Sequence, residues 1–366
     1  MQRVREEKDI SGCAIVGMIS EDGRRFSGET VIRSIASMRE RSNGLGGGFA
    51  AYGIYPDFAD LYAFHVMCDS ARARVAARRY LEETFKVRHQ EAIPRHAQSC
   101  TDSAPILERY FLEPPEPTTS RGAPCEAEED IIVRHVMFVN RNIDGAFVFS
   151  SGKNMGVFKG VGYPEEIGRF YRLDEYEAHT WLSHGRFPTN TTGWWGGAHP
   201  FGLLDWAVVH NGEISSYGIN RRYLENNGYF CTLRTDTEVI CYLFDLLMRR
   251  HRLPLEAAAA VLAPPFWTDI ERMPQDEAEL ARALRIVYAG ALLNGPFSVV
   301  VAHSGGLIGL NDRTKLRPMT AARSGGMLYL ASEESAIRAV CPSPDSLWYP
   351  EGGRPVVGRV REPAYA

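Results

Sequence analysis

The chain has 366 residues, of which 45% are hydrophobic and 23% are charged, the composition of an ordinary soluble globular protein. Its formal net charge of −4 gives no electrostatic reason to expect nucleic acid as a partner. No apolar run is long enough to span a membrane, and residues 1–10 lack the apolar core of a signal peptide. We therefore expect a protein that binds neither nucleic acid nor a membrane.

The seven cysteines are scattered, and no Cys-x-x-Cys occurs. An odd number without metal-ligand spacing argues against a disulfide framework and against a zinc site. We expect a cytoplasmic protein with no metal and no cofactor in this chain. Four cysteines lie within or beside apolar patterns and are predicted to be packing residues: Cys68, Cys231, Cys241 and Cys341.

The front of the chain begins with a polar leader, residues 1–12, followed by an apolar, β-branched run at 13–19 that predicts a buried strand. The Asp22-Gly23 pair predicts a hairpin turn before the next strand. Apolar residues at helical spacing predict an amphipathic helix over residues 29–41.

A glycine-rich segment at 42–53 lacks the spacing of a dinucleotide-binding fingerprint and has no βαβ pattern around it. Two interpretations remain open. It is either a flexible turn into a strand or a stretch of backbone that passes close to an active centre.

The middle of the chain predicts a strand at 61–67 and an Arg-rich helix at 71–85. A loop-rich, Pro- and Glu-rich segment near 85–135 is predicted to be an insertion into a single domain that spans residues 13–366. Three short apolar runs are predicted strands: 131–139, 145–150 and 155–159.

The remaining pattern predicts two helices, a hairpin, and a strand before a short helix. The predicted bounds are 235–248 and 276–292 for the helices, 296–310 for the hairpin, 327–331 for the strand, and a helix start at Glu333. Strands at both ends with helices between them suggest two sheets sandwiched by helices.

Between residues 181 and 238, polar residues recur at turns: Arg186, the Asn211-Gly212 pair and Asp236. Together they could hold a small zwitterion beside a polarised carbonyl. Taken singly, each has a simpler explanation: a surface arginine, a hairpin turn, and a helix N-terminus with a Thr235–Glu238 capping box.

Cys13 differs from the other cysteines because it starts a buried strand directly after Gly12. Removal of residues 1–12 would give it a free α-amino group, whose pKa of about 7.7–8.0 suits a general base near neutral pH. One residue would then supply both thiol and base, as in N-terminal nucleophile enzymes. On position alone, the simpler interpretation is a buried core cysteine.

Several motifs occur in the order found in class-II glutamine amidotransferases: CAIVG at 13–17, RFPTNT at 186–191, AHP at 198–200, HNGE at 210–213 and TDTE at 235–238. The later motifs NGPFSVV at 294–300, IGLNDR at 308–313 and LASE at 330–333 also resemble that family. The chain most resembles the separate amidotransferase subunit of glutamate synthase, with the N-methylglutamate synthase subunit a near neighbour. It departs from the family pattern at Ala14, where glycine is usual, and at Ser215.

The resemblance implies an α+β fold of the N-terminal nucleophile type: a four-layer αββα sandwich of two antiparallel sheets between helix layers. It also implies residue roles. Cys13 would be the nucleophile, Asn211 and the N–H of Gly212 the oxyanion hole, Arg186 the ligand of the glutamine α-carboxylate, and Asp236 the ligand of its α-ammonium. Thr189 and His210 would be further substrate-binding residues.

The implied activity is hydrolysis of L-glutamine to glutamate and ammonia through a thioester on Cys13. The ammonia would pass to a separate, FMN-dependent synthase subunit that can also carry an iron–sulfur cluster. The alternatives are the amidotransferase subunit of another synthase, such as N-methylglutamate synthase, a non-catalytic glutamine-binding regulatory module, and an amide hydrolase that acts alone.

Overall fold

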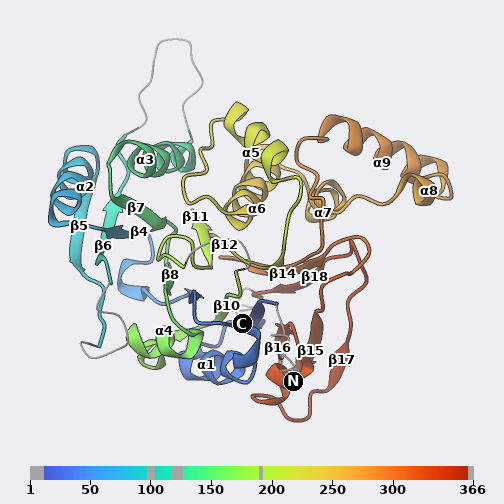
Figure 1. Cartoon of the computed structure of the whole chain (residues 1–366), viewed down its shortest axis with the longest axis horizontal. Helices are drawn as coiled ribbons and strands as arrows, with labels where there is room; N and C mark the ends of the chain where they lie inside the picture. The colour runs from blue at the N-terminus through green and yellow to red at the C-terminus, as the bar shows by residue number, and fades with distance from the viewer. Residues whose placement is uncertain (1–11, 97–103, 117–126, 189–192, 362–366) are drawn as a thin grey trace, which may run out of the picture.

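The computed structural model describes residues 12–96, 104–116, 127–188 and 193–361. Two antiparallel sheets pack against each other at its centre, and helices cover the outer face of each (Figure 1). This is the predicted four-layer αββα arrangement, so the fold class is confirmed. Residues 1–11 of the predicted leader lie outside the described residues.

The first sheet has seven strands in the order β17-β15-β16-β1-β10-β3-β8. Their bounds are β1 Ala14–Ser20, β3 Gly47–Tyr52, β8 Met155–Gly160, β10 Thr180–Gly185, β15 Thr320–Ser324, β16 Met327–Ala331 and β17 Ser346–Trp348. The second sheet has the order β11-β12-β13-β14-β18. Its strands are β11 Phe201–Leu203, β12 Trp206–Gly212, β13 Phe297–His303, β14 Gly306–Asn311 and β18 Val356–Arg359.

Helices of two groups form the outer layers. Those on the first sheet are α1 Gly28–Ala36, α4 Pro164–Phe170 and α10 Glu334–Arg338. On the second sheet lie α6 Asp236–Phe244, which continues as a π-helical turn at Asp245–Arg250, and α5 Tyr217–Asn226, which packs on α6. Beyond them α7 Leu255–Leu262, α8 Trp267–Ile270 and α9 Gln275–Val287 extend to one side (Figure 1).

A third, four-stranded sheet lies beside the sandwich with the order β5-β6-β4-β7. Its strands are β4 Tyr62–Cys68, β5 Lys86–Ala92, β6 Ile106–Glu113 and β7 Ala146–Ser150, and its helices are α2 Ala71–Thr84 and α3 Glu128–Asn142. A two-stranded pair, β2 Phe26–Ser27 with β9 Glu177–Ala178, completes the described strands. The segment predicted to be a loop-rich insertion thus contains β5, β6 and the first half of α3, while 97–103 and 117–126 lie outside the described residues.

Two local predictions in the front half are wrong. Residues 131–139 are not a strand but the middle of α3, because Ile132, Val136 and Val139 are buried at helical spacing, so packing of that face outweighs the strand propensity of β-branched residues. The Asp22-Gly23 turn does not join a hairpin, because β1 pairs with β10 and β16 while β2 pairs with β9.

The last long helix also departs from its prediction. It ends at Val287, and its predicted apolar face is largely uncovered: Leu280 is 59% and Val287 is 66% exposed. The other elements predicted near the C-terminus are confirmed. They are the hairpin of β13 and β14, the strand β16 and the short helix α10.

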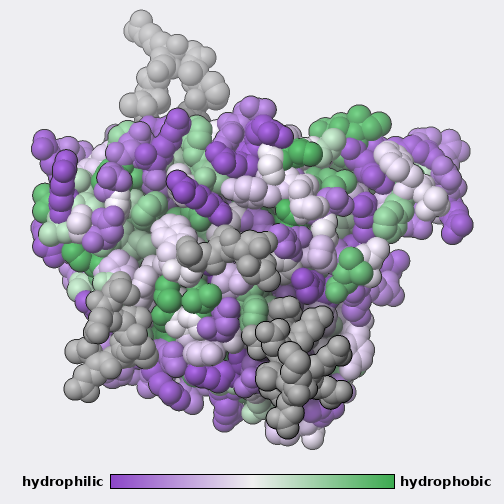
Figure 2. Space-filling view, viewed as in Figure 1, coloured by the Kyte–Doolittle hydropathy of each residue, from purple (hydrophilic) through white to green (hydrophobic). Residues whose placement is uncertain are grey.

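On the face shown in Figure 2, hydrophilic side chains predominate over α2 and α5, whereas apolar side chains are exposed over part of α9. None of the helices in the described parts of the chain is long and apolar enough to cross a membrane.

Gly17 sets the spacing of the two central sheets. A Cβ atom at this position of β1 would lie 2.6 Å from Cγ1 of Val300 on β13 and 3.2 Å from Cδ1 of Leu307 on β14. The sheets therefore approach more closely here than any side chain would allow, which fixes β1 against the second sheet.

Replacing this glycine tests the close approach. Gly17→Ala should destabilise the protein by about 1–3 kcal/mol, the usual cost of overpacking a core, measured as the free energy of unfolding in urea. In a Val300→Ala background the same change should be close to neutral, because the clashing methyl group is gone. An equal penalty in both backgrounds would contradict this explanation.

Candidate active site

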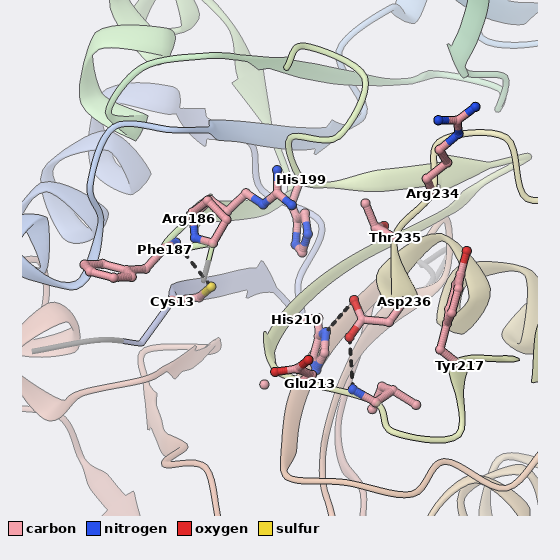
Figure 3. A pocket seen from close by; sticks show the side chains of 13 residues that line it. Cys13, Arg186, Phe187, His199, His210, Glu213, Tyr217, Arg234, Thr235 and Asp236 are labelled. Carbon is pink, nitrogen blue, oxygen red and sulfur yellow. Dashed lines mark hydrogen bonds and ion pairs between the residues drawn. The ribbon is translucent and has the colours of Figure 1, made fainter. Parts of the chain in front are cut away.

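A cavity of about 290 Å³ lies at the end of the sandwich where β1 begins and β10 and β12 end. It is lined by Cys13, Arg186, Phe187, Pro188, His199, His210, Gly212, Glu213, Ile214, Tyr217, Arg234, Thr235 and Asp236. Several strands, loops and the N-terminus of α6 contribute to it, so only the folded chain creates this site (Figure 3).

The structure brings most of the predicted site residues together. Those lining the cavity are Cys13, Arg186, His210, Gly212 and Asp236. Asn211 lies between two lining residues and is 1% exposed. Thr189 lies outside the described residues.

Cys13 stands at the start of β1, with its Sγ 3.5 Å from the backbone N of Phe187, which donates to it (Figure 3). Burial raises the pKa of this thiol, and the Phe187 N–H and the Arg186 guanidinium only partly offset that effect. The thiol is therefore protonated at neutral pH and needs a base before it can act as a nucleophile.

Arg186 directly follows β10 and is 7% exposed. Its backbone N–H donates to the carbonyl of Gly46 at 2.8 Å, and its carbonyl accepts from Oγ of Ser42 at 3.0 Å. A Cβ on Gly46 would lie 3.2 Å from Cδ of Arg186. The glycine-rich segment both turns into a strand, β3, and passes close to the candidate site, so the structure agrees with both interpretations of its position.

Asp236 is the first residue of α6, and Thr235 caps that helix by accepting from the N–H of Glu238 at 3.3 Å. Glu238 does not complete a capping box, because its carboxylate accepts from the N–H groups of Thr232 and Leu233 instead. Asp236 itself lines the cavity.

The Asp236 carboxylate remains charged although it is largely buried. Oδ2 accepts from the N–H of Ile214 at 3.0 Å, and Oδ1 lies 3.6 Å from Nδ1 of His210. Burial acts to raise the pKa of this carboxyl, but His210 and the Ile214 N–H outweigh it, so the pKa is lowered. The cavity therefore holds a carboxylate and the guanidinium of Arg186 on different walls.

Asn211 and Gly212 end β12. Side chains alternate along a strand, and Ala207 and Val209 belong to the core between the sheets, so Asn211 faces the first sheet, where β1 carries Cys13. Its Nδ2 is buried and has no hydrogen-bond partner among the described residues. Gly212 has φ 151°, and a Cβ there would lie 2.0 Å from the carbonyl of Pro296, so only glycine fits.

His199 is a cavity residue that sequence reasoning did not assign. Its ring stacks on His184 with the centroids 4.0 Å apart, and its Nε2 lies 3.2 Å from Oγ1 of Thr237. The same hydroxyl lies 3.2 Å from Nδ1 of His210. His199 is part of the AHP motif at 198–200, which marks it as a candidate, but nothing in the sequence shows that the loop carrying this motif lies beside α6.

Arg234, Tyr217 and Glu213 also line the cavity, and Arg234 extends away from the other side chains in Figure 3. Within the described ranges, no group of three or more His, Cys, Asp or Glu side chains is arranged to hold a metal ion. The five described cysteines are free: Cys13, Cys68, Cys231, Cys241 and Cys341.

Comparison with known proteins gives a consistent family. A family model described as class-II glutamine amidotransferases matches residues 87–341, a range that begins after Cys13. A protein of Archaeoglobus fulgidus that is named only as an uncharacterized protein is 49% identical over 361 residues, covering 98% of this chain and 95% of that protein.

Two further matches are to enzymes with longer chains. The glutamine–fructose-6-phosphate aminotransferase (isomerizing) of Bradyrhizobium diazoefficiens is 40% identical over 86 residues, which cover 23% of this chain and 13% of that enzyme. The structure of glutamine phosphoribosylpyrophosphate amidotransferase from B. subtilis with ADP and GMP is 14% identical, with a TM-score of 0.47, and the match covers 95% of this chain and 47% of that chain. Each match therefore spans less than half of the longer enzyme.

Proposed function

Because this chain belongs to the class-II glutamine amidotransferases, we propose that it hydrolyses L-glutamine to glutamate and ammonia through a thioester on Cys13. One observation carries this proposal: a single cavity gathers a thiol, a guanidinium, a carboxylate and a glycine N–H from four separate segments of the chain. These are the groups that a zwitterionic amide substrate requires.

The two ends of glutamine match the two charges of the cavity. Arg186 offers a planar fork of donors that fits the α-carboxylate, and the anionic Asp236 fits the α-ammonium. With both ends held, the side-chain amide would extend toward Cys13. His210, beside Asp236, would keep that carboxylate oriented.

The reaction then follows from the groups beside the amide. The α-amino group of Cys13, free once residues 1–12 are removed, takes the thiol proton, and the sulfur attacks the amide carbon. The resulting oxyanion accepts hydrogen bonds from Nδ2 of Asn211 and from the N–H of Gly212. The C–N bond breaks as the amino group returns the proton to the leaving nitrogen, and water later hydrolyses the thioester to glutamate.

The buried and unpartnered Nδ2 of Asn211 supports catalysis over the alternative of a glutamine-binding regulatory module. Leaving a buried donor unsatisfied costs about 1–3 kcal/mol, a cost that a transition-state oxyanion would relieve.

Steady-state kinetics separate binding from chemistry. Arg186→Ala and Asp236→Ala should mainly raise KM for glutamine, by about 10–100-fold, because each loses a charged hydrogen bond. Asn211→Ala should mainly lower kcat, by about 10²–10³-fold, because its bond strengthens only at the oxyanion.

Arg222→Ala, which removes an exposed arginine on α5, is the matched control and should leave both constants unchanged. If Asn211→Ala raised KM alone while Arg186→Ala lowered kcat alone, the roles would be reversed. Glutaminase activity that survives Cys13→Ala would exclude the thioester.

We further propose that the ammonia passes to a separate, FMN-dependent synthase subunit in the cytoplasm, of the glutamate synthase or the N-methylglutamate synthase type. The resemblance of the chain as a whole to the separate amidotransferase subunit of these synthases supports this. The five free cysteines accord with a reducing compartment. FMN, and any iron–sulfur cluster, would be held by the partner.

Co-purification tests the partner. The native chain, isolated from its source in mild salt, should bring with it a second polypeptide whose absorbance shows a flavin. Its glutaminase activity should fall when the two are separated, because such sites are commonly completed by docking. A chain that purifies alone and turns over glutamine at full rate would instead be the amide hydrolase that acts alone.

A further inference from the structure

Lys159 is a fully buried cation inside the sandwich. It lies on β8, is 0% exposed, and is among the largest completely buried side chains of the protein. Along β8 it shares a face with Val157, which belongs to the core between the sheets. A lysine is almost never fully buried unless its ammonium group is paired.

The ammonium group has one hydrogen bond among the described residues: Nζ donates to the carbonyl of Gly196 at 2.9 Å. It also lies 4.2 Å from the centre of the Phe201 ring. Burial lowers the pKa of this amine to about 7, while the carboxylate of Glu238 acts to raise it. The group is thus held at a cost to stability, because an apolar side chain of similar size would need no such partners.

Gly196 belongs to the loop that joins the cavity wall to β11. Residues 194–200 contain no helix or strand and are held internally by turn hydrogen bonds, from Gly197 N to Trp194 O and from Ala198 N to Trp195 O. The indole of Trp194 lies so close to Gly196 and Gly197 that a Cβ on either residue would clash with it. The Lys159 bond ties the tip of this loop to the first sheet.

The same loop delivers His199 to the cavity. His199 stacks on His184 and approaches Oγ1 of Thr237, which in turn lies 3.4 Å from Oδ1 of Asp236. A Cβ on Gly48 of β3 would lie 2.3 Å from the carbonyl of His199, so the loop backbone is pressed against the first sheet at this point. Displacement of the loop would therefore reach the wall that presents Asp236.

We propose that Lys159 is a positioning residue for glutamine hydrolysis: by holding the carbonyl of Gly196 it fixes His199 and, through Thr237, the carboxylate that receives the substrate ammonium. This inference rests on the proposed function of the cavity. Lys159 does not line the cavity and contacts none of the groups assigned to the reaction. Its effect on glutamine binding would therefore act only through the loop of residues 194–200.

Lys159→Met, which keeps the volume and removes the ammonium, tests the proposal in the full chain. KM for glutamine should rise about tenfold or more with little change in kcat, since displacement of a supporting loop weakens substrate positioning. The melting temperature should stay the same or rise, because a desolvated charge is gone.

Hydrogen–deuterium exchange gives a readout that does not depend on activity. Amides of residues 194–199 should exchange faster in Lys159→Met than in the wild type, while those of β1 and β12 stay unchanged. Lys153→Met is the matched control, because Lys153 precedes the same strand but is partly exposed and pairs with Glu128 at 2.9 Å. It should alter neither KM nor the exchange of the loop.

A Lys159→Met protein with wild-type KM and wild-type exchange in residues 194–199 would overturn the proposal. So would a general loss of stability in which the folded fraction keeps the wild-type KM, since that is the behaviour of a merely structural residue. If this variant does not fold, Lys159→Leu, which also lacks a hydrogen-bond donor, carries the same comparison. If the wild type hydrolyses no glutamine, the proposed function fails, whereas the exchange data still decide whether Lys159 holds the loop.

Discussion

The antiparallel register between β1 and β10 is the constraint on which the candidate site depends. Ala14 pairs with Gly185, so the residues just beyond them, Cys13 and Arg186, meet at one end of the first sheet. A slip by one residue would turn every side chain of β1 to the other face. Gly17 locks this strand against the second sheet, whose β12 ends beside the same cavity.

The protonation states of the groups in and beside the cavity then decide which charges a substrate meets there. Burial lowers the pKa of His184 to about 3 and that of His199 well below its ordinary value, so both rings are neutral near pH 7. The field that a zwitterion meets in the cavity is then set by Arg186 and Asp236, together with Glu213 and Arg234, which also line it. The thiol of Cys13, with a raised pKa, would then be activated by a neighbouring amine and not by the cavity itself.

The sequence allowed the layer order and five of the cavity residues to be predicted, because motifs that occur together in a fixed order mark segments that meet in the fold, even when each motif is weak alone. Local propensity failed where tertiary packing decides: β-branched residues around Val136 form a helix, and Leu280 and Val287 stay exposed despite helical periodicity. Lys159 could not be found from the sequence, since only the fold shows that its ammonium is buried under the loop of Gly196. The third sheet was missed because β5 is mostly polar and exposed.

The most direct test of Cys13 as the nucleophile is mass spectrometry of enzyme that is quenched in acid during turnover of isotopically labelled glutamine. If Cys13 attacks the amide, a labelled γ-glutamyl group will be found as a thioester on a peptide that begins at Cys13, and on no other cysteine. Labelled glutamate formed without any adduct on Cys13, or an adduct on Cys231 or Cys241, would contradict the mechanism proposed for this cavity.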